Sequence, residues 1–128
     1  MKETFEEFFE AIKNNRKYSP YVKSMNSEKY FEEFESEFNE VKEALKNKDY
    51  ENLQEELGDV LWDIFVFSLI LEEEGKIDMK QIMKGMLQKM KERKPHIFEK
   101  RMVSIEEEGE VFHKAKAIQK LRKGEKNG

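Results

Sequence analysis

The sequence predicts an all-α fold, a helical bundle of four to five helices that forms a single domain over residues 1–128. Helix-forming residues dominate its 128 positions, whereas the helix breakers are scarce, with 6 glycines and 2 prolines. Apolar residues recur every three or four positions in several segments, which is the period of an amphipathic helix. The stretch from Val60 to Leu71 has only Asp63 and Ser68 as polar residues, although 41% of the chain is charged. This stretch is therefore expected to form the most buried helix.

Composition excludes several classes of function. The net charge of −4, with the two signs interspersed, gives no basis for nucleic-acid binding. Cysteine is absent, which excludes disulfides, thiol catalysis and cysteine-ligated zinc. The chain has only 2 histidines, which are too few for a histidine-rich metal site. The apolar stretch is too short to span a bilayer, and the acidic N-terminus lacks the pattern of a signal peptide. We therefore expect a cytoplasmic protein that binds neither nucleic acid nor membranes.

A first helix is predicted from about Thr4, because the apolar residues that follow, up to Ile12, have helical spacing. Thr4 and Glu7 have the spacing of a capping box, in which each side chain bonds a free backbone amide at the start of the helix. The two asparagines that begin at Asn14 are weak helix formers, so the helix is expected to end there.

A loop is predicted from Tyr18 to Ser27, because this stretch contains Pro20 and several small polar residues. Within it, Tyr21 and Lys23 are weak candidates for contact with a ligand. Anchoring of the loop to the bundle is the favoured interpretation of its aromatic residues, since such side chains usually pack with their ring against apolar surface.

The second predicted helix runs from about Glu28 to Lys46, and Glu37 and Glu40 lie on the shoulder of its apolar stripe. The short linker from Asn47 to Asp49 then turns the chain, and its last residue is a plausible N-cap for the third helix. A linker this short makes the two helices antiparallel neighbours. The stripe consists of five apolar residues at helical spacing: Phe31, Phe34, Phe38, Val41 and Leu45.

Two pairs of acidic residues are predicted to meet in this hairpin. The first pair, Glu37 and Glu40, precedes the turn. The second pair, Glu56 and Asp59, follows the turn at about the same distance, so all four carboxylates converge at one level of the bundle. Carboxylates this close repel one another unless some are protonated or a cation lies between them. Oxygen ligands without histidine or thiolate indicate Mg²⁺ or Mn²⁺, and no EF-hand loop for calcium is present.

A simpler interpretation is that these acids form a solvated helix face. Glutamate makes up roughly a fifth of the chain, so pairs with this spacing arise by chance. They do recur elsewhere, for example at Glu3 and Glu6 and at Glu32 and Glu35. One such pair carries little information. Two pairs placed symmetrically about one turn, both bordering the core, favour the metal site.

A fourth helix is predicted from Met79 to about Lys94, after Gly75 ends the third helix and Asp78 caps the fourth. Lys89 and Arg93 lie four residues apart near the C-terminus of this helix and share a face. They either compensate the helix dipole or bind an anion.

The remainder of the chain is predicted to contain one more helix. Pro95 ends the fourth helix, and His96 to Phe98 forms a short hydrophobic anchor. Ser104 begins a C-terminal helix over about residues 104–121, with a capping box completed by Glu107. The tail, residues 122–128, is expected to be disordered. The core of the domain is expected to lie at about residues 19–98.

The segments Glu37-x-x-Glu40 and Glu56-Leu-Gly-Asp59 place an ExxE and an ExxD pair on consecutive helices. They are preceded by Ser19-Pro-Tyr-Val-Lys23 and followed by Lys89-Met-Lys-Glu-Arg-Lys-Pro-His-Ile-Phe98. In this combination the chain resembles the MazG-type nucleotide pyrophosphohydrolases of the all-α NTP pyrophosphohydrolase superfamily. In that family the flanking stretches have the forms Cys-Pro-Trp-Asp-Lys and Lys-x-x-x-Arg-x-Pro-His-Val-Phe.

The resemblance implies hydrolysis of a nucleoside or deoxynucleoside triphosphate to the monophosphate and pyrophosphate. It implies that Mg²⁺, or Mn²⁺ as a substitute, is held by four acidic residues: Glu37, Glu40, Glu56 and Asp59. Glu37 or Glu40 would activate the attacking water. Lys89 and Arg93 would bind the phosphates of the nucleotide substrate. Asp63 would be a further ligand, a group that supports the ligands, or a plain hydrogen-bonding residue at an interface.

Two other classes of function stay open. One is a related all-α pyrophosphatase specific for dUTP, dCTP or phosphoribosyl-ATP, although the Pro95-His-Ile-Phe98 segment favours the MazG branch. The other is a non-catalytic helical interaction module whose acids are solvated. The third helix is apolar on all sides, so we also predict a homo-oligomer, a dimer or a dimer of dimers. Its interface candidates are Trp62, Phe65 and Phe67.

Overall fold

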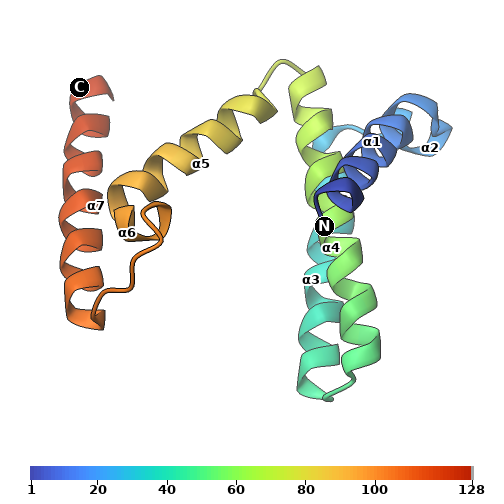
Figure 1. The fold of residues 1–128 in the computed structure, drawn as a ribbon. Helices are drawn as coiled ribbons and strands as arrows, with labels where there is room; N and C mark the ends of the chain where they lie inside the picture. The colour runs from blue at the N-terminus through green and yellow to red at the C-terminus, as the bar shows by residue number, and fades with distance from the viewer. Residues whose placement is uncertain (128) are drawn as a thin grey trace. The chain divides into compact units, whose positions relative to one another are not determined.

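The computed structural model describes residues 1–127, with side chains through Gly124, and within that range it has seven helices and no strand (Figure 1). The helices are α1 (Lys2–Tyr18), α2 (Pro20–Lys23), α3 (Ser27–Lys46), α4 (Tyr50–Glu73), α5 (Met79–Arg93), α6 (Pro95–Phe98) and α7 (Ile105–Asn127). The all-α prediction is confirmed. Helices α2 and α6 are single turns added to the five long helices, and α2 forms inside the predicted loop. None of the described helices has the length and apolar character that a membrane span requires.

Two compact units make up the chain, Met1–Met79 and the part from Lys80 onward. The first unit holds α1 to α4, and the second holds nearly all of α5 together with α6 and α7. The acidic pairs predicted to bind metal lie in the first unit. The basic pair predicted to bind phosphate lies in the second.

Helix α1 extends beyond its predicted limits at both ends. It starts ahead of Thr4 and Glu7, which lie inside the helix, and Met1 at the N-cap position makes no side-chain cap bond. The predicted capping box is therefore wrong. The helix also continues past Asn14, because a tertiary contact holds its last turn.

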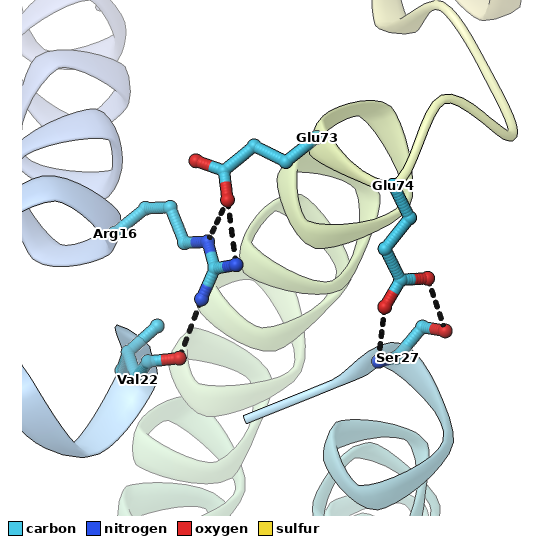
Figure 2. A network of polar contacts seen from close by, with 5 residues as sticks. All are labelled: Arg16, Val22, Ser27, Glu73 and Glu74. Atoms are coloured by element: carbon cyan, nitrogen blue, oxygen red, sulfur yellow. Dashed lines mark hydrogen bonds and ion pairs between the residues drawn. The ribbon is translucent and has the colours of Figure 1, made fainter. Parts of the chain in front are cut away.

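That contact belongs to a network at the C-terminal end of α4 (Figure 2). Arg16 of α1 donates from Nε to Glu73 at 2.8 Å, and its guanidinium also donates to the carbonyl oxygen of Val22. The neighbouring Glu74 accepts the backbone N–H of Ser27 at 3.0 Å and the hydroxyl of Ser27 at 2.6 Å. Two adjacent carboxylates thus tie α1, α2 and the start of α3 to the end of α4.

Helices α3 and α4 form the predicted antiparallel hairpin and lie side by side in Figure 1. Asp49 caps α4 as predicted, accepting the backbone N–H of Asn52 at 3.2 Å. Lys48 in the turn has a φ of 56°, in the left-handed region. After α4, Gly75 also adopts a left-handed φ of 74°, which glycine tolerates best and which ends the helix as predicted.

The face of α3 that packs on α4 differs from the predicted stripe. Three of the predicted residues are largely exposed: Phe31 at 44%, Phe38 at 51% and Leu45 at 59%. Phe34 of the predicted stripe is buried, together with Ser27, Tyr30 and Ala44, which the stripe did not include. At 100° per residue, the centre of this row is turned by roughly 45° from the centre of the predicted stripe. The rotation brings Glu37 onto the α4-facing side.

The core of the first unit is a cluster in which all four of its helices take part: Ile12, Val22, Tyr30, Val66 and Ile70. The aromatic residues of α4 that are candidates for an oligomer interface are half-buried and also make contacts within this unit. Trp62 meets Phe8 edge to face at 5.7 Å between ring centroids, and Phe67 stacks on Phe34 at 6.2 Å. Phe65 contacts two aromatic rings of α1.

In the second unit, polar contacts join α5 and α6 to α7. Arg93 Nε donates to Gln119 Oε1 at 2.8 Å, and the buried His96 pairs through Nε2 with Glu108 at 2.8 Å. The predicted cap of α7 is present, since Ser104 Oγ accepts the backbone N–H of Glu107 at 3.1 Å. Helix α7 continues to Asn127. Residues 122–127, expected to be disordered, are therefore helical, and Gly128 lies outside the described residues.

Candidate metal centre

Three carboxylates meet near the middle of the α3–α4 hairpin. Glu37 of α3, and Glu56 and Asp59 of α4, each place one oxygen within 4.8 Å of the others. Glu56 and Asp59 are three residues apart, so they share one helical face. Glu37 reaches them because it lies on the side of α3 that packs against α4. Three of the four acids proposed as ligands are thus within reach of one cation.

Burial sets Glu37 and Glu56 apart from the solvated acids of the chain, whereas Asp59 is exposed. Glu56 is only 9% exposed, and its Oε2 is buried without a hydrogen-bond partner. The same holds for Oε2 of the half-buried Glu37. A buried carboxylate oxygen without a partner is costly, because it has lost its water and gained nothing in exchange. A divalent cation that prefers oxygen ligands would satisfy both atoms at once.

The electrostatics of the cluster follow from this crowding. The pKa of Glu56 is raised to about 7, first by the neighbouring carboxyl of Glu40, then by burial and by the carboxyl of Glu37. Burial is also the main cause that raises the pKa of Glu37, and the charges of Asp59 and Glu40 add to it. Glu40 itself is exposed and outside the closest trio. Its interaction with Glu56 nevertheless makes it the fourth member of the acidic group.

Asp63, for which the sequence left three roles open, makes a hydrogen bond within the bundle. It is buried and accepts a hydrogen bond from the hydroxyl of Tyr30 at 2.8 Å. Burial raises the pKa of Asp63, and the bond from Tyr30 partly opposes that effect. Sequence reasoning missed Tyr30, although its spacing of four and seven residues from Phe34 and Glu37 marks the packed face of α3.

The two weak candidates of the N-terminal segment lie on α2. The hydroxyl of Tyr21 donates a hydrogen bond to Glu33 of α3, and this bond raises the pKa of Tyr21. Tyr21 thus ties α2 to α3, in agreement with the anchoring interpretation. Lys23 is exposed at the end of the same short helix.

The basic pair lies on α5, in the second unit. Lys89 is exposed, and its carbonyl oxygen accepts a long hydrogen bond of 3.5 Å from Gln119. Arg93 is half-buried: its Nε binds Gln119, and its guanidinium lies 5.2 Å from the ring centroid of Phe112. Helix α7 thus orients Arg93 through one polar contact and one cation–π contact.

The model of the MazG nucleotide pyrophosphohydrolase domain matches residues 25–98, which include the acidic group and the basic pair. The chain belongs to this family. A crystal structure of a MazG-related protein from Thermotoga maritima superposes on this MazG chain with a TM-score of 0.80 at 28% identity. That match covers 88% of this chain and 98% of the Thermotoga chain.

Two curated relatives are longer proteins. The MazG chain is 34% identical to the uncharacterized protein YabN of Bacillus subtilis over 84 residues. This matched stretch makes up 66% of this chain and 17% of YabN. It is also 34% identical to the nucleoside triphosphate pyrophosphohydrolase of Escherichia coli K12 over 59 residues. That stretch makes up 46% of this chain and 22% of that enzyme. The chain therefore spans about a fifth of the length of these relatives.

Proposed function

We propose that this chain is a Mg²⁺-dependent hydrolase that converts nucleoside or deoxynucleoside triphosphates to the monophosphate and pyrophosphate. One observation carries the proposal: Glu37 and Glu56 each bury a carboxylate oxygen that has no hydrogen-bond partner, in a group that Asp59 completes. Such an arrangement opposes folding unless a proton or a cation offsets the repulsion, and the burial of both oxygens favours a binding site over a solvated face. Membership of a nucleotide pyrophosphohydrolase family supplies the class of reaction.

In the proposed reaction, water attacks the α-phosphorus and the bond to the bridging oxygen of the β-phosphate breaks. The ligands would be Glu37, Glu40, Glu56 and Asp59. A Mg²⁺ bound by them would lower the pKa of a bound water and offset charge on the phosphates. Glu37 or Glu40 accepts the proton of the attacking water, and pyrophosphate leaves. Lys89 and Arg93 neutralise the triphosphate, because positioning and electrostatics dominate phosphoryl transfer.

The test is an assay of pyrophosphate release over a panel of nucleotides that includes dUTP, dCTP and phosphoribosyl-ATP, with Mg²⁺, with Mn²⁺ and with EDTA. We expect pyrophosphate and the monophosphate with either metal and no turnover in EDTA. Orthophosphate and a diphosphate as products would mean cleavage at the wrong bond. If no nucleotide is hydrolysed and Mg²⁺ does not change the melting temperature, a non-catalytic interaction module would be favoured instead.

We further infer that the chain forms a homo-oligomer. Six large apolar side chains of the hairpin are largely exposed in the single chain: Phe31, Phe38, Leu45, Leu57, Leu61 and Ile64. Exposed apolar surface on this scale is typical of a protein interface. These residues join Trp62, Phe65 and Phe67, which are half-buried in the single chain, as the interface candidates. Sedimentation equilibrium is expected to give a dimer or tetramer at micromolar concentration, and a stable folded monomer would contradict the inference.

A further inference from the structure

An open hollow of about 560 Å³ lies over α3 beside the candidate metal centre. Its lining is Met25, Lys29, Glu32, Glu33, Ser36 and Glu37. Glu37 belongs to both the hollow and the carboxylate trio, so the two are continuous. Lys29, Glu33 and Glu37 are spaced four residues apart and form one row along the helix. At 1.5 Å per residue, this row extends about 12 Å from the metal centre.

The charge of the hollow decides which part of a nucleotide it can hold. Three carboxylates face one ammonium group among its lining residues, so it repels phosphates, which would instead stay at the metal centre. A carboxylate accepts hydrogen bonds and donates none. The hollow therefore suits a neutral group that carries hydrogen-bond donors. Met25 at its far end adds a polarizable thioether of the kind that packs on aromatic rings.

Glu33 is the carboxylate best placed for this recognition. It is half-buried, lies one turn from Glu37, and is held by the hydrogen bond that Tyr21 donates to its Oε1. A carboxylate fixed in this way loses little further side-chain entropy when it accepts a second hydrogen bond.

We propose that this hollow binds the nucleoside end of the substrate and that Glu33 accepts a hydrogen bond from a sugar hydroxyl or a base amino group. The inference rests on the proposed function, and it adds a residue that selects among nucleotides. A site that bonds a donor discriminates against the analogue that lacks it, because its acceptor is then left desolvated and unpaired. Since the hollow is open to water, the discrimination should be moderate, on the order of tenfold.

The test compares kcat/KM for pyrophosphate release within pairs that differ by one donor: ATP with 2′-deoxy-ATP, ATP with 3′-deoxy-ATP, ATP with ITP, and CTP with UTP. The first two pairs report a sugar hydroxyl, and the last two report an amino group. We expect the wild type to prefer the donor-bearing member of at least one pair by about tenfold. Glu33→Ala is expected to reduce that preference to less than about twofold while pyrophosphate is still released.

Tyr21→Phe is the matched control, because it removes the bond that orients Glu33 and keeps the carboxylate. It should weaken the preference less than Glu33→Ala does, because the acceptor is still present. Equal kcat/KM within every pair, or a preference that survives Glu33→Ala, would overturn the subsite and leave the proposed function standing. No pyrophosphate from any nucleotide would overturn the proposed function and the subsite with it.

Discussion

The α3–α4 hairpin carries carboxylates at two levels, and the two sets are treated in opposite ways. At the C-terminal end of α4, Glu73 is paired with Arg16, and both oxygens of Glu74 accept hydrogen bonds from Ser27 (Figure 2). Near the middle of the hairpin, Glu37 and Glu56 each bury an oxygen that has no partner. The same side chain, on the same pair of helices, is satisfied by the protein at one level and left unsatisfied at the other.

The protonation of the two sets follows the same division. Hydrogen bonds from the hydroxyl and backbone N–H of Ser27 lower the pKa of Glu74 to about 2. The neighbouring carboxyl of Glu40, together with burial, raises the pKa of Glu56 to about 7. Folding therefore favours the charged form of Glu74 and disfavours the charged form of Glu56. A carboxylate with donors around it stabilises the fold, whereas one surrounded by other acids needs a proton or a cation to offset the repulsion.

The largest expected effect comes from removing a carboxylate near the middle of the hairpin, where Glu37 and Glu56 each have an oxygen without a hydrogen-bond partner. Glu56→Gln should lower kcat/KM for pyrophosphate release by a factor on the order of a thousand, because it removes a proposed metal ligand and the charge stabilisation that depends on it. Mg²⁺ should raise the melting temperature of the wild type by several degrees and leave that of the variant unchanged. Without metal, the variant should melt higher than the wild type, because one source of repulsion is gone.

Circular dichroism separates this outcome from unfolding, since the helical spectrum of Glu56→Gln should match that of the wild type. Glu43→Gln, which changes an exposed glutamate of α3, serves as the matched control and should retain both the metal response and the activity. A variant that still gains thermal stability from Mg²⁺ would show that Glu56 is not a ligand. The contrast between the two levels would then lose its functional meaning.

Substitution of Arg93 tests whether a side chain that already contacts α7 can also bind the phosphates of the substrate. If Arg93 only compensates the dipole of α5 and holds α7, Arg93→Met should lower the stability of the fold through its lost contacts and leave activity nearly intact. If it binds the triphosphate, the variant should lose about 2–4 kcal/mol of transition-state stabilisation, about a hundredfold in kcat/KM. We expect the second result. The Mg²⁺-induced shift in melting temperature without nucleotide should be unchanged, because the acidic residues are intact.

Gln119→Ala is the control for Arg93, since it removes the hydrogen-bond partner on α7 and keeps the guanidinium. It should reduce kcat/KM far less than Arg93→Met does. If both variants reduce kcat/KM by the same large factor, the contact with α7 is what matters. If neither does, Arg93 has only a structural role.

The sequence predicts the acidic group because its information is local. Glu37 and Glu56 lie at similar distances from one short turn, and a hairpin of two regular helices brings such positions to one level. The limits of α4 were equally accessible, since Asp49 and Gly75 are strong signals for the start and end of a helix. What these features share is that neighbours within a few residues determine them.

Features that depend on distant residues were not predictable in the same way. The last turn of α1 is held by Glu73, which lies 57 residues from Arg16, and no local pattern indicates that contact. The buried face of α3 was misjudged because Phe31 and Phe38 are more apolar than Tyr30. The hydroxyl of Tyr30 has a buried partner in Asp63, so tyrosine can take the inner position. Hydrophobicity alone cannot report a partner of this kind.

The smallest expected effect concerns Glu74 at the C-terminal end of α4, whose oxygens both accept hydrogen bonds from Ser27. Glu74→Gln keeps an acceptor oxygen for Ser27 but loses the negative charge that strengthens both hydrogen bonds. At pH 7, in EDTA, we expect its melting temperature to lie a few degrees below that of the wild type. Ser27→Ala removes only the hydroxyl donor and should give a smaller decrease, because the backbone N–H of residue 27 still bonds the carboxylate.

The pH dependence of this difference identifies its cause. Folding lowers the pKa of Glu74 from 4.5 to about 2, so the folded state binds fewer protons between these values and the stability from this group falls as the pH falls. The gap in melting temperature between the wild type and Glu74→Gln should thus be constant above about pH 5 and close as the pH approaches 2. Thermal melts followed by circular dichroism at pH 7, 5 and 3 measure it. A gap at pH 3 as large as at pH 7 would show that the contribution of Glu74 is steric rather than electrostatic.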